Sequence, residues 1–283
     1  MTGRLNLPAL RAWVAAAILS SVIGGGVFGH AQAPQSGLPS IVGIRTGIPI
    51  AEAYTILKQH DAKGMIQYSQ KRIEEISDKP ITYGLMWSTT GSPEDRELIG
   101  VDITFPPSEQ KVWRISRRIL FPPGHEPLAE AMLNSLRKSF GPELPARTVG
   151  QSVWAFDTEG RPAQGKGVDL VDCGQTLSFP DMPNAVSAFS SAQTATAMSP
   201  DVALSPNTAA ANREACHQFV FVVARLTYAA GSTATLHSVA VTITDIGGGI
   251  RAGLATQAVL NGAVSVEQKA ALKKAQEQPV PRF

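Results

Sequence analysis

The sequence lacks a surplus of charge of either sign. It contains 25 Lys and Arg against 23 Asp and Glu. Two of the cations, Arg4 and Arg11, lie in an N-terminal segment with no carboxylate before residue 32, so the remainder of the chain is formally neutral. Because a nucleic-acid-binding protein needs an excess of Lys and Arg to contact phosphates, this balance argues against a nucleic-acid partner.

Cysteine is also scarce, since Cys173 and Cys216 are the only two. Neither directly follows the N-terminal apolar run, which excludes a lipid-attached lipoprotein. A metal or redox pair has no support, because there is no CxxC spacing and His217 alone cannot complete a metal site. In an exported chain, two cysteines most economically form one disulfide. We therefore predict that Cys173 and Cys216 are bonded and close the base of a long loop.

The motifs of several enzyme classes are missing. There is no GxSxG nucleophile elbow, no HExxH metal motif, and no GxGxxG or GK(S/T) phosphate loop. We interpret the glycine run Asp245–Gly249 as a flexible turn between a strand and a helix. No catalytic residue, metal ligand or cofactor is predicted. A hydrolase is the alternative, with a triad that gathers His125, His217 or His237 beside a Ser and a carboxylate from distant positions.

An uncharged apolar run, residues 13–33, follows two arginines and ends in small residues. These are the parts of a secretory signal peptide. We place cleavage after Ala31, because a cut after Ala33 would leave Pro34 as the first residue. An uncleaved anchor is the alternative, since the run approaches the length that spans a bilayer. The prediction is a signal peptide at 1–31 and a periplasmic or secreted mature protein.

The stretch Glu97–Phe121 predicts a hairpin at the centre of the fold. Its first arm alternates apolar and polar residues with the period of a half-buried strand, and two prolines separate it from the second arm. Arg114 and Arg118 share the polar face and are expected across from Asp102, in an ion pair worth well under about 1 kcal/mol. Arg117 falls on the apolar face. We expect it near a strand end or reaching to water, with a buried pair to a carboxylate as the alternative.

Other periodic segments surround this hairpin, and the stretch 179–215, rich in Ala, Ser, Thr and Pro, predicts a long loop. Strands grouped in hairpins, without βαβ alternation, favour an α+β fold. We expect one domain, 32–283, with a largely antiparallel sheet of six to eight strands and two or three helices on one face. The further expected strands are Met65–Ile76, Ile81–Thr89, Gln151–Thr158, Gln218–Tyr228 and Leu236–Thr244. The expected helices are one that begins at about Pro49 and ends near His60 to Gly64, and three at about Pro127–Phe140, Ile250–Leu260 and Val266–Gln276, the last with a capping box at Ser265 and Gln268.

Three tryptophans, Trp87, Trp113 and Trp154, fall in predicted strands of this one sheet. Core packing is the first interpretation, and an exposed aromatic platform for a peptide or glycan is the second. With Arg114 and Arg118, these residues form the candidate interaction surface. A small-molecule carrier is a further alternative, in which the same tryptophans line an apolar cleft.

Three segments, Gly43–Leu57, Leu136–Glu143 and Val153–Phe156, resemble the helix, glycine-proline turn and aromatic strand of small exported α+β modules. These modules are the β-lactamase-inhibitor-like proteins and the small lipoproteins of outer-membrane assembly. The resemblance covers about a third of the chain and transfers no functional residue. It implies two helices on a short antiparallel sheet that acts by binding other proteins. We therefore predict an exported, non-catalytic binding or envelope-assembly protein with a protein or envelope partner, which contacts a membrane only if its N-terminal segment is retained.

Overall fold

The computed structural model describes residues 37–74, 76–89, 96–145, 149–163, 170, 173 and 214–276. The predicted signal peptide, 1–31, lies outside these ranges, as does the predicted loop at 179–215 apart from its last two residues. Residues 34–283 form one compact unit, to which all of the described residues belong. No helix within the described ranges is long and apolar enough to cross a membrane.

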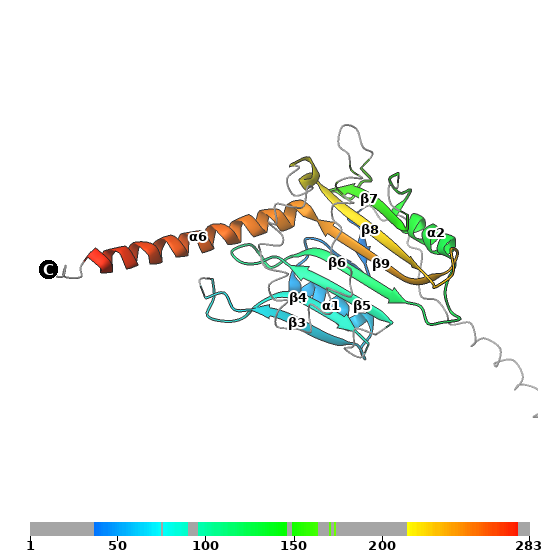
Figure 1. Ribbon diagram of the computed structural model, residues 1–283, viewed down its shortest axis with the longest axis horizontal. Coiled ribbons are helices and arrows are strands. Elements are labelled where there is room, and N and C mark those ends of the chain that lie inside the picture. The colour runs from blue at the N-terminus through cyan, green and yellow to red at the C-terminus, as the bar shows by residue number, and fades with distance from the viewer. Residues whose placement is uncertain are drawn as a thin grey trace, which may run out of the picture. The chain divides into compact units, whose positions relative to one another are not determined.

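Within the described residues, seven strands form one antiparallel sheet, which confirms the predicted α+β class. Two short strands form a separate hairpin (Figure 1). In spatial order the sheet contains β3 (Met65–Lys71), β4 (Ile81–Ser88), β5 (Glu97–Ile103), β6 (Val112–Leu120), β9 (Leu236–Asp245), β8 (Phe219–Tyr228) and β7 (Gln151–Asp157). The remaining elements are β1 (Ser40–Ile41), β2 (Ile44–Arg45), α1 (Ile50–His60), α2 (Ala129–Phe140), the 3-10 helix η2 (Glu214–Gln218) and α6 (Ile246–Gln276).

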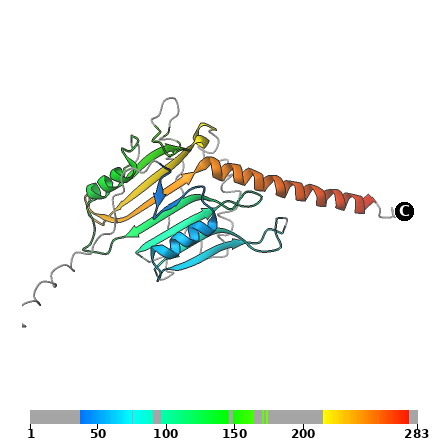
Figure 2. The ribbon, with the colours of Figure 1, turned by 180° about the vertical axis from the view of Figure 1, so that it is seen from behind.

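Helices α1 and α2 cover the same face of the sheet, which we call the helix face (Figure 2). Each helix turns an apolar stripe toward the strands, and alternate strand residues point up to meet it. The short β1–β2 hairpin packs on β6 between them. The main core is therefore a single apolar layer, whose largest fully buried members are Trp87, Trp154, Ile44, Leu57, Leu85, Ile99, Ile103, Ile115, Leu236 and Ile243.

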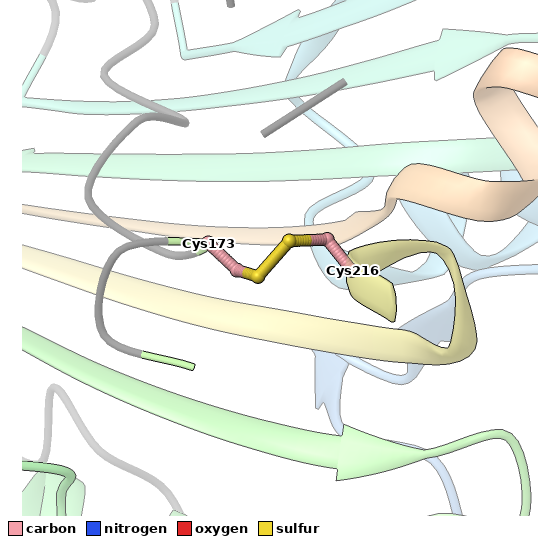
Figure 3. The surroundings of a disulfide bond; sticks show 2 residues. All are labelled: Cys173 and Cys216. Carbon is pink, nitrogen blue, oxygen red and sulfur yellow. A yellow bond between two sulfur atoms is a disulfide. The ribbon is translucent and has the colours of Figure 1, made fainter. Parts of the chain in front are cut away.

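A smaller apolar cluster lies on the opposite face, over β7 and β8. Cys173 and Cys216 form the predicted disulfide at its centre, with their Cα atoms 5.8 Å apart (Figure 3). Both cysteines are fully buried beside Phe221 and Ile246. The disulfide therefore ties η2, which packs against α6, to the segment at Cys173, 43 residues before Cys216 in the chain.

The sheet consists of two similar halves. In the first half α1 precedes the strands β4, β5 and β6, and in the second half α2 precedes β7, β8 and β9. Each helix starts with an isolated bridge to the residue before the last strand of its half, Pro49 with Lys111 and Leu128 with Thr235. β3 has no counterpart in the second half. The flanking backbone hydrogen bonds also correspond, from Val112 N to Ile48 O (2.9 Å) and from Leu236 N to Pro127 O (3.0 Å).

This correspondence extends along both helices. Counted from the two bridges, Ala53 of α1 matches Met132 of α2, and Leu57 matches Leu136. All four side chains are buried against the sheet. The two helices therefore dock on their strands in the same register, although one uses a small side chain where the other uses a large one.

The last strands of the two halves, β6 and β9, pair at the centre of the sheet. Arg117 lies directly opposite Val241. A rotation about an axis through this pair exchanges the two halves, so the sheet has a pseudo-twofold axis there. The neighbouring pairs are symmetric about the axis, with Ile115 opposite Ile243 on one side and Ile119 opposite Val239 on the other.

The prediction of a flexible turn at Asp245–Gly249 is wrong, because β9 continues directly into α6. Asp245 stabilises the start of the helix by accepting a hydrogen bond from the backbone N–H of Gly248 at 2.7 Å. The glycines permit close packing instead of flexibility. A Cβ on Gly249 would lie 2.6 Å from the ring of Trp113.

The two predicted C-terminal helices are likewise one helix. Ser265 and Gln268, the predicted capping box, fall inside α6. Asn261 and Gly262 do not interrupt it, since neither residue removes a backbone donor as proline would. The first part of α6 packs on β6 and β8. The buried Thr256 hydroxyl donates to Pro106 O, in the loop between β5 and β6, at 3.0 Å. Beyond it the helix extends away from the strands (Figures 1 and 2).

Several predicted bounds shift by a few residues. β3 ends at Lys71 instead of Ile76, and α2 starts at Ala129 instead of Pro127. In α2 the bridge at Leu128 keeps the preceding backbone extended, so the helix cannot begin earlier. Local patterns locate such elements well but fix their ends poorly, because tertiary hydrogen bonds decide where pairing stops.

Candidate functional site

Three ionisable side chains meet on the helix face of the first half. His60, the last residue of α1, places Nε2 3.1 Å from Oε1 of Glu97 at the start of β5. Arg117, in the middle of β6, donates from Nε to the same oxygen at 2.8 Å. These side chains are 23%, 23% and 18% exposed, so water reaches a cluster that is otherwise enclosed. We call His60, Glu97 and Arg117 the polar triad.

The polar triad shows which interpretation of Arg117 holds. Arg117 lies in the middle of β6, opposite Ile99 of β5. Glu97 is two residues before Ile99 on the same face of the sheet, so its carboxylate lies within reach of the Arg117 side chain. The pairing with a carboxylate, which was the alternative expectation, is the arrangement in the structure.

Trp87 of β4 packs beside the triad. Its ring meets that of His60 edge-on, with 4.8 Å between the ring centroids. Its Nε1 is buried and has no hydrogen-bond partner among the described residues. A Cβ on Gly64 would lie 2.0 Å from that nitrogen, so only glycine fits where the chain passes from α1 to β3. The indole thus fixes both the end of α1 and the start of the next strand.

The electrostatics of the triad keep Glu97 ionised. Burial disfavours the charge, but the hydrogen bond from His60 and the positive charge of Arg117 outweigh it, so the pKa of Glu97 is lowered. A carboxylate that orients a histidine ring is also the arrangement of a general base. Within the described ranges, no Ser, Thr or Cys side chain is hydrogen-bonded to His60. The described residues therefore offer the triad no nucleophile.

The second half lacks this cluster at the corresponding place. Val241 stands opposite Arg117 across the axis. The pseudo-twofold axis exchanges Ile119 and Ile243. Glu97 is the cross-strand partner of Ile119, and Val222 is the partner of Ile243, so Val222 corresponds to Glu97. The residue of α2 that corresponds to His60 is Ser139. The polar triad is therefore a feature that the first half adds to a shared packing scheme.

A second ion pair lies on the opposite face of the same strands. Arg114 of β6 donates from Nε to the carboxylate of Asp102, its cross-strand neighbour on β5, as predicted. The prediction that Arg118 also stands across from Asp102 is wrong, because Arg118 lies opposite Leu98. The side chains are only 13% and 6% exposed, so the expectation of a surface pair is wrong. Burial raises the pKa of Asp102 although the charge of Arg114 opposes this. Arg114 also lies over the ring of Trp113, 5.1 Å from its centroid.

The five residues of the predicted interaction surface do not share one exposed surface. Trp87 and Trp154 are each 2% exposed and belong to the core on the helix face, as the core interpretation expected. Arg118 is 7% exposed on the opposite face, where burial lowers its pKa. Trp113 and Arg114 are half-buried. Alternate residues of a strand point to opposite faces, and both faces are buried here, which is why strand membership alone misplaced them.

The histidines named for a hydrolase triad do not assemble one within the described residues. His125 and His237 are exposed, and neither side chain is hydrogen-bonded to a carboxylate or a hydroxyl there. His217 lies in η2, with its carbonyl against Gly247. In the same ranges no group of three or more His, Cys, Asp and Glu side chains is arranged to hold a metal ion.

The edge strand β3 carries an unusual surface. Met65 is 49% exposed and Tyr68 is 53% exposed, which places two of the largest exposed apolar side chains on one strand. The Tyr68 ring stacks on that of Tyr54 of α1, with 6.1 Å between centroids, so it is held in place without being covered. No charged residue occurs from Met65 to Gln70.

The other edge of the sheet is different, because the chain covers it. Leu144 N donates to Val153 O, and Ala163 N donates to Ala155 O, each at 2.8 Å. These bonds bring the segments before and after β7 alongside it. Among the described residues no other strand pairs with β3 beyond β4.

The sequence contained signals for some of what was missed. The pentapeptides Pro49–Ala53 and Pro127–Ala131 differ at one position and lie at the two helix starts. This sequence match is offset by one residue from the structural correspondence, in which Pro49 matches Leu128. The triad has no such signal, because its members lie 37 and 20 residues apart and only the strand register brings them together.

Comparisons with known proteins found no matching family model, no matching curated protein and no matching solved structure. The resemblance to small exported binding modules therefore stays a prediction.

Proposed function

We propose that this chain is an exported, non-catalytic binding protein of the cell envelope that takes up a protein partner along the edge strand β3. The observation that carries the proposal is the exposure of Met65 and Tyr68 on the outermost strand of the sheet. Soluble proteins usually protect such an edge with charges, proline or a covering segment, since an unprotected edge invites pairing with another chain. β7 is covered in this way, and β3 is not covered by the described residues.

The chemistry of β3 supports strand addition. An extended segment that joins an edge gains backbone hydrogen bonds, and the alternate side chains of the edge give specificity. Tyr68 lies on the helix face and Met65 on the opposite face, so an added strand would meet an apolar contact on each side. The stack with Tyr54 holds the Tyr68 ring in place before a partner arrives, which lowers the entropy cost of binding.

The disulfide between Cys173 and Cys216 supports the export part of the proposal. Disulfides persist in oxidising compartments and are rare in the cytosol. We place the mature protein in the periplasm or outside the cell, starting at residue 32. Periplasmic fractionation with a tag on the C-terminus tests this, and recovery of the full-length chain in the cytosol would contradict it.

The binding proposal is tested with immobilised mature protein and the native envelope fraction, followed by mass spectrometry. Met65→Lys/Tyr68→Lys should abolish capture of the partner, because two cations then line the edge. Val149→Lys is the matched control, since it changes an exposed apolar residue away from β3 and should leave capture intact. Equal capture by all three proteins, or capture by none, overturns the proposal.

The pair of His60 and Glu97 favours one alternative function, a hydrolase that uses His60 as a base. Purified protein would then cleave ester or peptide probes, and His60→Gln would remove this activity with little loss of stability. Absence of cleavage by the wild-type protein rejects this alternative and leaves the triad a structural cluster.

A further inference from the structure

The residues at the two ends of β3 indicate what kind of segment binds it, provided that the proposed edge binding holds. We propose that the partner segment is an extended strand of a different protein, with an uncharged, partly apolar centre and acidic residues at both ends. The centre of β3, Met65 to Gln70, is uncharged, whereas cations stand at either end of it.

The cations are placed to meet a neighbouring strand. Lys63 is exposed in the turn that leads into β3. Lys71 is the last residue of β3, and the exposed Arg72 follows directly. An added strand would run between these groups, so its two ends would each lie beside a positive charge. Opposite charges on neighbouring strands attract, and exposed pairs of this kind select a partner more than they tighten it.

Two carboxylates near these cations, Asp61 and Glu74, are described, and neither holds them firmly. The Asp61 carboxylate accepts a hydrogen bond from the backbone N–H of Lys63 at 2.9 Å, and it bonds to that amide instead of the ammonium group. Glu74 lies 3.7 Å from Arg72, but the two side chains are 81% and 61% exposed, so water and salt screen the pair. A partner carboxylate that binds through better geometry can therefore compete.

The same charges disfavour a second copy of this chain as the occupant. Antiparallel pairing of two β3 strands would place Lys71 and Arg72 of each copy close to Lys63 of the other. Three cations would gather at each end of the shared pair, and like charges on neighbouring strands are destabilising. A foreign strand with acidic ends avoids this repulsion.

Two synthetic peptides test the inference with the mature protein. Both have alternating Val and Thr at the centre, and one carries Asp pairs at its ends where the other carries Lys pairs. The Asp peptide should bind roughly tenfold more tightly at low salt, which is what a few exposed ion pairs contribute, and the difference should shrink at high salt. Hydrogen exchange should slow at β3 amides when it binds.

Charge reversal at the ends of β3 provides the decisive variant. Lys63→Glu/Arg72→Glu should reverse the preference, so that the Lys peptide binds more tightly, and Lys138→Glu on α2 is the matched control that should not. Should reversal impair folding, Lys63→Gln/Arg72→Gln should remove the preference alone. Equal binding of both peptides, or a wild-type dimer that Tyr68→Lys dissociates, overturns the inference. Partner capture that is lost in Met65→Lys/Tyr68→Lys while both peptides bind equally would refute the acidic ends and retain the proposed function.

Discussion

In the second half of the sheet α2 covers β7, β8 and β9, and the described residues on its helix face are uncharged where this half meets the pseudo-twofold axis. In the first half α1 covers β4, β5 and β6 with the polar triad at the same place, and the half adds β3 at its outer edge. The second half thus acts as an internal control. Since the buried Val222 and the partly buried Val241 take the corresponding positions, neither Glu97 nor Arg117 is needed to build this type of half.

This difference has an energetic consequence. Enclosing charges removes them from water, and their mutual attraction often only offsets that cost. Apolar side chains of similar size usually hold a core at least as well. The polar triad is therefore better explained by what it does at the end of α1 than by a contribution to overall stability. Its His60 ring contacts Trp87, and Gly64, in the turn that leads into β3, packs on the same indole.

The largest expected effect concerns a feature of the second half alone, the disulfide. Cys173→Ala/Cys216→Ala should lower the free energy of unfolding by about 4 kcal/mol, because a closed loop of this length restricts the unfolded chain. Urea unfolding under oxidising conditions measures the loss. The same loss should follow reduction of the wild-type protein, and a variant as stable as the oxidised wild type would contradict the prediction.

The next effect probes the triad directly. Glu97→Ala should cost about 2–3 kcal/mol, because His60 and Arg117 would face each other in a largely enclosed site without the carboxylate. The control is His60→Ser/Glu97→Val/Arg117→Val, which copies the second half and should remain within about 1 kcal/mol of the wild type. If this triple variant is less stable than Glu97→Ala, the two halves are not equivalent at this place.

A smaller effect tests the packing that the first half builds around Trp87. Gly64→Ala should cost about 1–3 kcal/mol, because its Cβ would overlap the indole. Trp87→Phe should restore part of this loss in the double variant, since the smaller ring leaves room. In the turn after α2, Gly141→Ala should cost about 1–3 kcal/mol for a different reason, since its backbone at φ +83° and ψ −168° is one that almost only glycine adopts, and this loss gains nothing from Trp87→Phe. Additive losses for Gly64→Ala and Trp87→Phe would show that the two residues do not touch.

The smallest effect is a dependence on pH. Because the pKa of Glu97 is lowered in the folded state, the unfolded chain binds more protons as the solution becomes acidic. The contribution of Glu97 is complete above the ordinary glutamate pKa of about 4.3 and is lost as pH falls through the lowered value. Urea midpoints of the wild type should fall more steeply below this pH than those of Glu97→Gln. Glu130→Gln on α2, an exposed residue, should follow the wild-type profile.

The sequence predicted the fold class, the strands and the disulfide, because these depend on local patterns and on the scarcity of cysteine. It placed Asp102 beside Arg114 correctly, since cross-strand neighbours follow from the hairpin alone. The sequence did not predict that this pair is buried. Polar residues alternate with apolar ones along a strand whether the polar face is open to water or covered, so the pattern does not show that this face is covered.

The candidate sites were harder to predict from sequence. The triad requires α1 to end above β5, and β3 is recognisable as an edge only once the order of all seven strands is known. The continuation of β9 into α6 was missed because three successive glycines usually mark a turn. Here they allow the helix to pass closely over Trp113 and His217.

The pairing of Arg117 with Val241 has a consequence for how such a chain can vary. In a dimer of identical halves, the residue at this position would face its own copy across the centre. Valine fits that situation, whereas an arginine would meet a second arginine at the shortest cross-strand spacing and be repelled. Covalent joining of the halves removes this restriction, since one side can carry a cation while the other stays apolar. A fused chain can therefore place a single charge at its centre of pseudo-symmetry without pairing it with its own copy.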